Sequence, residues 1–546
     1  MNNTVQIKSG QDARNEILAG ARQLESIVSS TLGPGGRNVL LKHLQEQIPQ
    51  STKDGVTVAR FVDLDNEWHD TGCQLLKQAS MRTALNAGDG TTSTVVYAYN
   101  LMDALNRRLS EDPTQDVHEM RQELETARDL MIEALKRDNF SFRSSSLDDI
   151  YNVAYTSTNG DKQISTLIRQ AYEKFGQNYG TIMIEPSTTS DTTVEIQQGM
   201  KLMSGYESYY FVSDTSKMIA ELDHPAVIIT DFKIDRGAEV LRWLSQINQE
   251  YKSVLIIAEN ITGEAMSTLV ANHVQNKMKI CLVCPTFFGQ HRRDHLQLLA
   301  SATGAKPFYA DSGQRVSDFN LSYVGHCDYA MITKDETTLT LSTDCFDALN
   351  AETEKIKAQL SEILQRLPEE SDEVQWKRQL LAYAQGNVAK IKVGGRSQTE
   401  IYERRDRIED AVSAVRSSLE EGLAVGAGST YIRLASVVPD SNKMKPEIMH
   451  AATSVKRKLC ENLSFSKEDT AAIIDSELTL VGHNFNCHTS ICLLKDRRVS
   501  SVGDPVMLGI VDPAKVIRNC IENAISVATM FLLTDNIALK IETPLI

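Results

Sequence analysis

The feature that most constrains the fold of this chain is a change of pattern between its two ends and its middle. Apolar residues recur at helical spacing in residues 12–31 and 114–137, and helical patterns return near the C-terminus. Residues 226–335 instead alternate strand and helix, which predicts a parallel or mixed sheet in a separate α/β domain. The expected strands are 226–230, 254–258 and 280–283, and the expected helices between them are 238–250 and 264–275.

Size and charge narrow the class of protein. A chain of 546 residues exceeds what one hydrophobic core supports and predicts roughly three or four domains. Its 57 basic and 72 acidic residues give a net charge of −15, without a basic block for nucleic acid or anionic membranes. The N-terminus does not resemble a secretory signal.

The apolar segment 516–533 contains Arg518 and Glu522, so it predicts a buried helix rather than a membrane span. We therefore expect a cytoplasmic protein that binds neither nucleic acid nor membrane.

The nine cysteines are scattered, as in a reduced cytosolic protein. Cys281 and Cys284 form the one C-x-x-C, within an apolar run typical of a strand. A zinc site would need two more ligands, and His291 and His295 are the nearby candidates. Buried structural thiols are the favoured interpretation.

A glycine-rich loop at residues 87–94, with the sequence AGDGTTST, carries the clearest chemical signal. Glycine permits close approach of the backbone to a phosphate, and a helix beginning at the hydroxyl residues would add its free N–H groups. An aspartate among such groups would repel phosphate unless a cation lay between them, which favours a metal–nucleotide complex. The alternative, equally supported by this loop alone, is a turn whose aspartate and threonines cap the next helix.

For three other acidic residues, a purely structural role is an alternative to a role in binding or catalysis. Asp54 lies in the polar loop 51–60, where a turn with a solvated charge pair is the simpler interpretation. Asp410 is opposite the apolar face of a helix around 408–419, so it is expected either on a solvated face or on a moving arm that delivers a catalytic group. Asp512 precedes Pro513 and the last long helix, where an N-cap would explain it completely.

The middle region has more apolar side chains than one core requires. Four aromatic residues lie between Tyr206 and Phe211, and Trp243 widens the apolar stripe of the helix that contains Leu241 and Leu244. Most of these side chains are expected in the core. The surplus could form an exposed apolar groove that binds other chains.

Taken together, five motifs resemble the group I, GroEL-type chaperonins. They occur in the family's order at near-family spacing, and the resemblance runs almost from end to end. The motifs are TLGPGGRNV (31–39), TKDGVTVAR (52–60), AGDGTT (87–92), RIEDA (407–411) and IVDPAKV (510–516).

The resemblance implies a multidomain α+β subunit, mostly helical, that assembles into rings. Its three domains would be a helical equatorial ATP-binding domain, a small α/β intermediate domain and an α/β apical domain. The expected boundaries are 1–137 and 421–546 for the equatorial domain, 138–197 and 389–420 for the intermediate domain, and 198–388 for the apical domain.

The resemblance also assigns an ATPase site. Asp89 would bind Mg²⁺, Asp54 would position the attacking water and the metal, and Asp410 would support hydrolysis. K⁺ is an expected further cation. Residues expected around the nucleotide are Thr31, Leu32, Gly33, Pro34, Lys53, Gly88, Asp89, Gly90, Thr91, Thr92, Ser93, Gly428, Asn486 and Asp512.

The implied function is ATP-dependent folding of non-native polypeptides inside a homo-oligomeric cage, with seven-membered rings and a GroES-like co-chaperonin as expected partners. The cell would be a bacterium or a phage-infected host. Residues expected to bind the polypeptide are Tyr206, Tyr210, Phe211, Leu241, Leu244, Met266, Val270 and Ala271.

Departures from the family pattern predict a divergent member, and a phage-encoded protein is one hypothesis. Gly35 replaces a lysine, Gly426-Ala427-Gly428 replaces three glycines, and residues 489–503 carry an insertion. Three alternatives are a small-molecule kinase or ligase that uses the same loops, a passive shell protein, and a group II chaperonin. The first would need a polar substrate pocket, the second would not retain three aspartates, and the sequence GRNV and segment 206–211 favour group I over the third.

Overall fold

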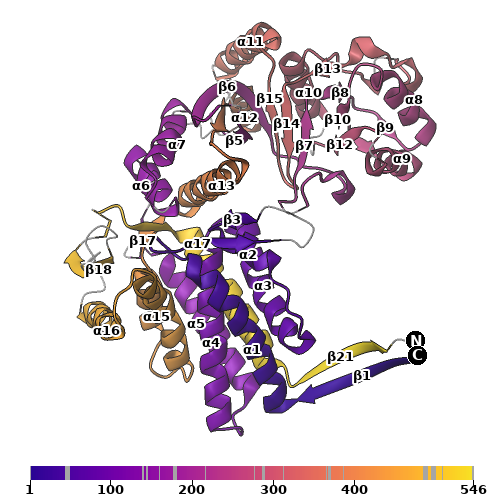
Figure 1. Cartoon of the computed structure of the whole chain (residues 1–546). Coiled ribbons are helices and arrows are strands. Elements are labelled where there is room, and N and C mark those ends of the chain that lie inside the picture. Colours follow the sequence, from indigo (N-terminus) through magenta and orange to yellow (C-terminus); the bar gives the residue numbers. More distant parts are fainter. Residues whose placement is uncertain are drawn as a thin grey trace. The chain divides into compact units, whose positions relative to one another are not determined.

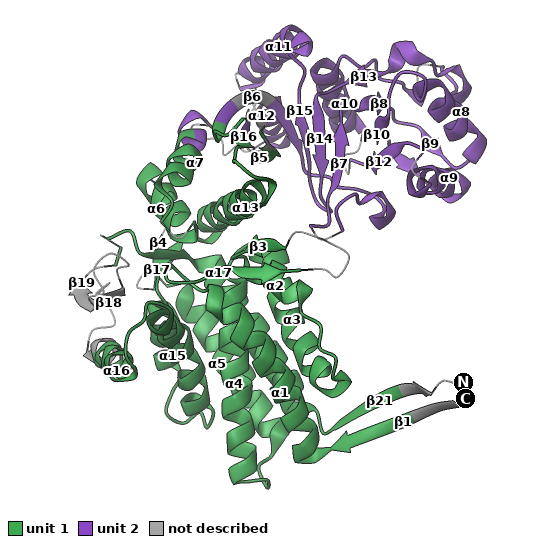
Figure 2. Ribbon diagram, viewed as in Figure 1, with its two compact units in different colours: residues 1–170, 184–193, 392–546 green, residues 171–183, 194–391 purple. Residues whose placement is uncertain are grey.

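The computed structural model divides the chain into two compact units (Figure 2). Unit 1 comprises residues 1–170, 184–193 and 392–546, and unit 2 comprises residues 171–183 and 194–391. Both ends of the chain therefore belong to unit 1. The structure describes residues 2–42, 49–137, 140–142, 146–158, 160–175, 181–187, 189–215, 217–275, 277–285, 289–310, 313–364, 366, 371–384, 387–483, 490–493, 500–503, 505–506 and 508–543.

Unit 1 is built around a long central helix, α4 (Thr91–Glu111), which packs most extensively against four other helices (Figure 1). Those helices are α1 (Gly10–Val28), α3 (Glu67–Ala87), α15 (Lys445–Asn462) and α17 (Ala514–Leu533). The remaining helices that lie in unit 1 are α2 (Gly55–Phe61), α5 (Val117–Leu135), α6 (Leu147–Ser157), α13 (Gln398–Glu421), α14 (Ser429–Val437) and α16 (Lys467–His483). Helix α7 (Lys162–Phe175) begins in unit 1 and ends in unit 2.

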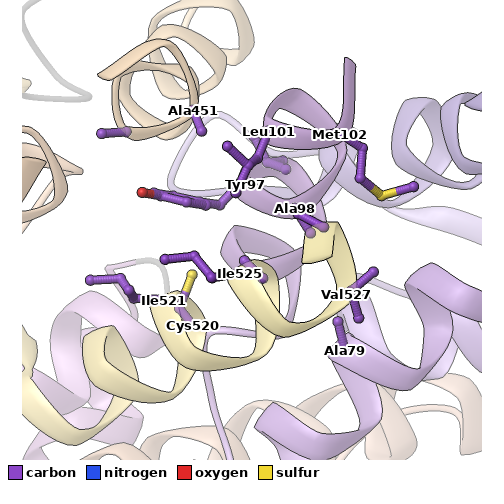
Figure 3. Close-up of a cluster of buried hydrophobic side chains, with 14 of the residues drawn as sticks. Ala79, Tyr97, Ala98, Leu101, Met102, Ala451, Cys520, Ile521, Ile525 and Val527 are labelled. Atoms are coloured by element: carbon purple, nitrogen blue, oxygen red, sulfur yellow. The ribbon is translucent and has the colours of Figure 1, made fainter. Parts of the chain in front are cut away.

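The interface between α4 and α17 is the centre of the core (Figure 3). Tyr97 and Leu101 of α4 are fully buried, as are Cys520 and Ala524 of α17. Helix α17 is long and apolar enough to cross a membrane, but most of its surface is covered by the rest of the protein. The helix is apolar because it packs against α3, α4 and α5. The buried helix predicted from the presence of Arg518 and Glu522 in this segment is therefore confirmed.

Short antiparallel sheets surround this bundle. Strands β1 (Asn2–Ser9) and β21 (Asn536–Thr543) bring the two chain ends together as a two-stranded arm. The others pair β2 (Val39–Leu41) with β3 (Gln50–Thr52), β18 (Ser490–Leu493) with β19 (Ser500–Gly503), and β17 (Leu423–Val425) with both β4 (Ser141–Phe142) and β20 (Val511–Pro513). The insertion recognised near residues 489–503 thus contains the β18–β19 pair.

Unit 2 contains the predicted α/β region. Its four-stranded sheet has the order β12-β10-β8-β13, with three parallel strands and one antiparallel edge, so the expected mixed sheet is confirmed. The strands are β8 (Ala226–Ile229), β10 (Ser253–Ile257), β12 (Lys279–Val283) and β13 (Gly325–His326). The helices are α8 (Gly237–Ile247), α9 (Gly263–Val274), α10 (Gly289–Thr303), α11 (Phe346–Leu364) and α12 (Asp372–Ala384).

A second, six-stranded sheet has the order β5-β16-β6-β15-β14-β7. These strands are β5 (Thr181–Pro186), β6 (Thr193–Leu202), β7 (Ala220–Asp223), β14 (Tyr329–Ile332), β15 (Thr337–Thr340) and β16 (Asn387–Val393). The multidomain α+β fold class is therefore confirmed. The boundaries of three separate domains remain a prediction.

Candidate functional site

The turn Gly88-Asp89-Gly90 joins α3 to α4, and two left-handed glycines give it its shape. Gly88 (φ 71°) ends α3 and Gly90 (φ 79°) directly precedes α4. A Cβ on Gly88 would lie 2.3 Å from Cβ of Ser413, and a Cβ on Gly90 would lie 2.3 Å from Cγ1 of Val516. Both positions therefore require glycine for the backbone conformation and for close packing against α13 and α17.

The carboxylate of Asp89 does not cap the helix that follows it. One oxygen accepts a 2.5 Å hydrogen bond from the Gly90 N–H, and the other accepts one of 3.0 Å from Oγ of Ser157 in α6. No side chain caps the start of α4. The capping alternative for this loop is therefore wrong, and the N-terminus of α4 keeps the unshielded dipole that favours an anion.

The loop after α1 lies beside the start of α4. Thr31 is in the short 3₁₀ helix Ser29–Thr31, and its Oγ1 lies 3.4 Å from Oγ1 of Thr92. The side-chain amide of Asn462 in α15 holds this loop by donating to the carbonyls of Ser29 (3.0 Å) and Leu32 (2.9 Å). The loop continues through Gly33 and Pro34, where Gly33 has a φ of 71° and leaves no room for a Cβ beside α15.

Asp54 is the N-cap of α2, directly after Lys53. Its side chain accepts hydrogen bonds from the backbone N–H of Val56 (3.0 Å) and Thr57 (2.9 Å). This cap replaces the expected solvated charge pair. A Cβ on Gly55 would lie 2.1 Å from Oγ1 of Thr92, so the start of α2 touches the start of α4. Asp54 is thereby fixed next to the Gly88–Gly90 turn.

Asp410 of α13 lies close to Asp54 and Asp89, although the three are far apart in sequence. Burial raises the pKa of Asp410 well above its usual range, and the nearby charges of Asp54 and Asp89 raise it further. Helix α13 is tied to the end of α3 because Oγ of Ser417 donates a 2.9 Å hydrogen bond to the Ala87 carbonyl. The expectation of a solvated helix face is therefore wrong for Asp410.

Asp512 is in strand β20, opposite Ala424 of β17, and is not a helix cap. The N-cap of α17 is Pro513, which has no side-chain hydrogen bond to the helix. The N-cap explanation is therefore wrong, because the helix begins one residue later than the Asp-Pro pattern indicates. Burial raises the pKa of Asp512 to about 7, and the charge of Asp89 contributes to this shift.

The glycine loop before α14 completes this side of the site. A Cβ on Gly426 would lie 3.2 Å from Oδ1 of Asp512. Gly428 (φ 77°) precedes α14 and packs against the backbone of Lys456. Ala427 between them has a φ of 54°, a left-handed conformation that costs a non-glycine residue roughly 1–2 kcal/mol. Asn486, expected near the base, lies outside the described residues.

The four aspartates form an acidic cluster in which Asp54 and Asp89 act on Asp410, and Asp89 acts on Asp512. The largest charge interactions of Asp410 are all with other carboxylates, and the pKa of Asp89 is raised by burial first and then by Asp54. Each of the four side chains is nevertheless partly exposed, so a ligand can reach it. Mg²⁺ commonly binds one or two carboxylates together with phosphate oxygens, and this donor set beside a free helix N-terminus fits that requirement.

Ser157 belongs to this site but was not predicted. Its hydroxyl is the side-chain donor to Asp89, and α6 holds it there. The sequence around it, Tyr155-Thr-Ser-Thr158, is an ordinary polar helix end. It contains neither a glycine nor a charged residue that would have indicated a ligand.

In unit 2, the residues predicted to bind polypeptide divide into two groups. Phe211 is fully buried and Leu244 is 5% exposed, so both belong to the core and are corrections to the prediction. Tyr210 is 63% exposed, Leu241 is 49% exposed and Ala271 is also exposed. The side chains of Tyr206, Met266 and Val270 are partly buried.

The exposed apolar residues of unit 2 differ from the expected groove at Trp243 and at two further positions. Trp243 does not widen an exposed groove, because it is 1% exposed and its indole N–H donates to the Val316 carbonyl at 3.2 Å. Tyr209 (51% exposed) and Val274 (59% exposed) were not predicted and lie on the same elements as Tyr210 and Ala271.

Cys281 and Cys284 are free thiols. Cys281 is fully buried in β12, and Cys284 is partly buried. Burial raises the pKa of both thiols, that of Cys284 to about 12. His291, a candidate ligand for a zinc site with these cysteines, stacks on Trp376, with ring centroids 4.4 Å apart. These observations agree with structural thiols.

Comparison with known structures shows the same fold in a viral protein. The crystal structure of the chaperonin gp146 from bacteriophage EL 2 (Pseudomonas aeruginosa), in the presence of ATP-BeFx, matches with a TM-score of 0.67 and 21% identity. The match covers 98% of this chain and 99% of that one. A second crystal form of the same chaperonin matches with a TM-score of 0.61 and 20% identity over the same shares of the two chains.

The family model of the TCP-1/cpn60 chaperonins matches residues 24–541. This match contains all five sequence motifs, all of unit 2 and most of unit 1. It confirms the family predicted from the motifs, and with it a chaperone role in general. The chain belongs to the TCP-1/cpn60 chaperonin family.

Proposed function

We propose that this protein is an ATP-driven folding chaperone whose hydrolytic site is the acidic cluster at the start of α4. The observation that carries the proposal is the convergence of Asp54, Asp89 and Asp410 from three separate elements. A structural role would account for Asp54 as a helix cap. It would not account for an Asp410 carboxyl whose pKa is raised by burial and by the charges of Asp54 and Asp89, beside an uncapped helix N-terminus.

The nucleotide phosphates would lie against the backbone N–H groups of Thr91, Thr92 and Ser93, as phosphate does at helix N-termini. Thr31 lies at the same place because its hydroxyl is next to that of Thr92, and Lys53 directly precedes Asp54 in the chain. Asp512 and Gly428 would face the ribose and base. When bound, Mg²⁺ would neutralise phosphate charge, with Asp89 as its protein ligand. The expected K⁺ ion has no assigned residue.

Asp54 and Asp410 would act on the attacking water. Asp54 is held rigidly by two backbone hydrogen bonds, which suits it to orient a water molecule. Asp410 lies in a buried setting that raises the pKa of its carboxyl, which makes it a stronger proton acceptor. Because α13 is one long helix, a shift of this helix would move Asp410 into or out of the site.

The decisive experiment compares ATP binding and hydrolysis in Asp410→Ala and Glu409→Gln variants. We expect Asp410→Ala to lower kcat by about 100-fold or more while leaving ATP binding intact, as for loss of a general base. Glu409 pairs with Arg405 on the same helix (2.8 Å) and serves as the matched control with near-normal turnover. Equal turnover in the two variants would overturn the proposed role of Asp410.

The client-binding surface would be formed by the exposed apolar side chains of unit 2. Tyr209 and Tyr210 are in the 3₁₀ helix Tyr209–Phe211, which packs against α9, and α9 packs against α8. Leu241 on α8 and Val274 on α9 add exposed aliphatic groups. Such a surface can bind exposed hydrophobic segments with little sequence preference.

The arm formed by β1 and β21 supports assembly into a homo-oligomeric ring. It extends from the helices of unit 1 as two strands with free edges (Figure 1). Val5 is 57% exposed and Ile7 is 64% exposed on this arm. A lone two-stranded sheet is only marginally stable in water, so pairing with another copy would stabilise it. Seven subunits per ring, a GroES-like lid, a cytoplasmic location and group I membership are parts of the same proposal.

A further inference from the structure

A cluster of three chemically different metal-binding side chains lies in unit 2, outside the proposed ATP site. Among the described residues, His326, Asp344 and Cys345 form a group whose ligand atoms all lie within 4.8 Å of one another. Nε2 of His326 is 3.0 Å from Oδ2 of Asp344. The three residues are far from the C-x-x-C pair in sequence, and no spacing motif marks them.

Two elements of the fold bring these residues together. His326 ends β13, the short antiparallel edge strand that pairs with β8 through only two residues. Asp344 and Cys345 are in the 3₁₀ helix Thr343–Cys345, which leads directly into α11. Helix α10 packs against both β13 and this 3₁₀ helix. A shared ion would therefore join an edge strand to the start of a helix across the surface of α10.

The burial of the three side chains suits a metal site that keeps one position open to solvent. Cys345 is 4% exposed and forms the floor of the cluster. The side chain of His326 is 40% exposed and that of Asp344 is 64% exposed, so both can move slightly to improve their geometry. One imidazole nitrogen, one carboxylate oxygen and one thiolate are all normal ligands of Zn²⁺, whose fourth position water can fill.

We propose that His326, Asp344 and Cys345 bind one Zn²⁺ ion per chain and that this ion clamps β13 to the start of α11. Binding forms a zinc–sulfur bond at Cys345 and releases the thiol proton to solvent, without any oxidation or reduction. The ion replaces the direct contact between His326 and Asp344. Zinc binds the folded cluster and not the separated segments, so it stabilises unit 2 by linkage.

The test uses the full-length chain, stripped of metal with a chelator and then titrated with Zn²⁺ against a competing chromophoric chelator. We expect one tight site per chain. His326→Gln and Asp344→Asn alter exposed side chains, so both should fold normally. Each should weaken zinc binding by more than about 100-fold, since the loss of a mere outer-shell partner already costs roughly 10–100-fold. Cys281→Ser should bind zinc like the parent chain.

Cobalt(II) provides a second readout that identifies the sulfur ligand. The Co²⁺-loaded parent chain should show a thiolate-to-metal charge-transfer band, and Cys345→Ser should lose this band. Zinc should raise the unfolding temperature of the parent chain and leave that of His326→Gln unchanged. Absence of a tight stoichiometric site would overturn the proposal. So would zinc binding that survives all three ligand substitutions.

Discussion

The two regions assigned to function differ in how the chain builds them. In the acidic cluster of unit 1, Asp54 is a helix cap and Asp89 lies in a glycine turn, and hydrogen bonds fix both carboxylates, while Asp410 lies in α13 and Asp512 in β20. The apolar surface of unit 2 consists of side chains on helices whose other faces form the core. In the first region, Thr31 and the helix that Asp54 caps both contact Thr92 at the start of α4. In the second, Phe211 and Leu244 are buried while Leu241 is exposed.

The difference shows that the position of a residue in the fold is easier to predict when that residue type is stable in few environments. A glycine with positive φ between two helices has one conformational explanation, and an aspartate beside it needs a partner. A leucine is equally at home in the core and on a binding surface. The residues that the motifs name in the first region remain a prediction with a consistent geometry, whereas the residues that the resemblance names in the second include two that are buried in the core.

The largest expected effect is a difference in the free energy of unfolding between a core and a surface leucine of helix α8. Leu244→Ala removes a 5% exposed side chain and should lower the free energy of unfolding by about 2–5 kcal/mol. Leu241→Ala alters a 49% exposed side chain and should change stability by about 0.5 kcal/mol or less. Denaturant unfolding measures both values.

The exposed leucine of this pair, Leu241, also tests the binding of non-native polypeptide. Leu241→Ala should reduce the capture of a chemically unfolded model polypeptide, measured as suppression of its aggregation, while the subunit remains fully folded. If Leu241→Ala binds the polypeptide as well as the parent chain does, the surface assigned to α8 is wrong.

The next effect concerns the turn before α4. Gly90→Ala places a methyl group 2.3 Å from Val516 and forces alanine into a left-handed conformation. The two penalties together should destabilise the chain by about 2–4 kcal/mol and abolish tight ATP binding. Gly10→Ala is the matched control, because Gly10 also has a positive φ but has open space around its Cβ position. If Gly10→Ala is equally damaging, steric closure of the site is not the cause.

The sequence predicted the fold well where its patterns were long. The βαβαβ run and the terminal helices match the structure because each buried face repeats over several turns or strands. It failed where the outcome depended on a neighbouring element. The Asp512-Pro513 pair indicates a helix cap, yet pairing of β20 with β17 takes Asp512 into a strand. The contact of Ser157 with Asp89 depends on the placement of α6, which no local pattern encodes.

A buried histidine of the unit 2 core and the acidic cluster of unit 1 should make stability respond to pH in opposite directions. Burial lowers the pKa of His295 in unit 2 to about 4, so its protonation destabilises the folded state. Stability should therefore fall as pH drops from about 6.5 towards 4, by on the order of 3 kcal/mol for this group. Burial raises the pKa of Asp512 in unit 1 to about 7, so the ligand-free chain should lose stability as pH rises from about 4 to 7.

Denaturant unfolding of the ligand-free chain across this pH range measures both responses. His295→Phe should remove the acid-side loss, and Asp512→Asn should remove the loss on the neutral side. The difference between parent and variant isolates each group from the other titrating side chains. A variant whose pH profile parallels that of the parent chain would show that its group is not shifted.

The smallest expected effect concerns Ala427, which lies between the two glycines that precede α14. Its φ of 54° imposes a strain of roughly 1–2 kcal/mol that glycine would not have. Glycine also increases the entropy of the unfolded chain, which offsets about 0.5–1 kcal/mol of the gain. Ala427→Gly should therefore stabilise the chain by up to about 1 kcal/mol. Ala84→Gly within α3 is the control and should destabilise by about that amount. Opposite signs for the two substitutions would establish that the strain resides in the loop before α14, and equal losses would contradict it.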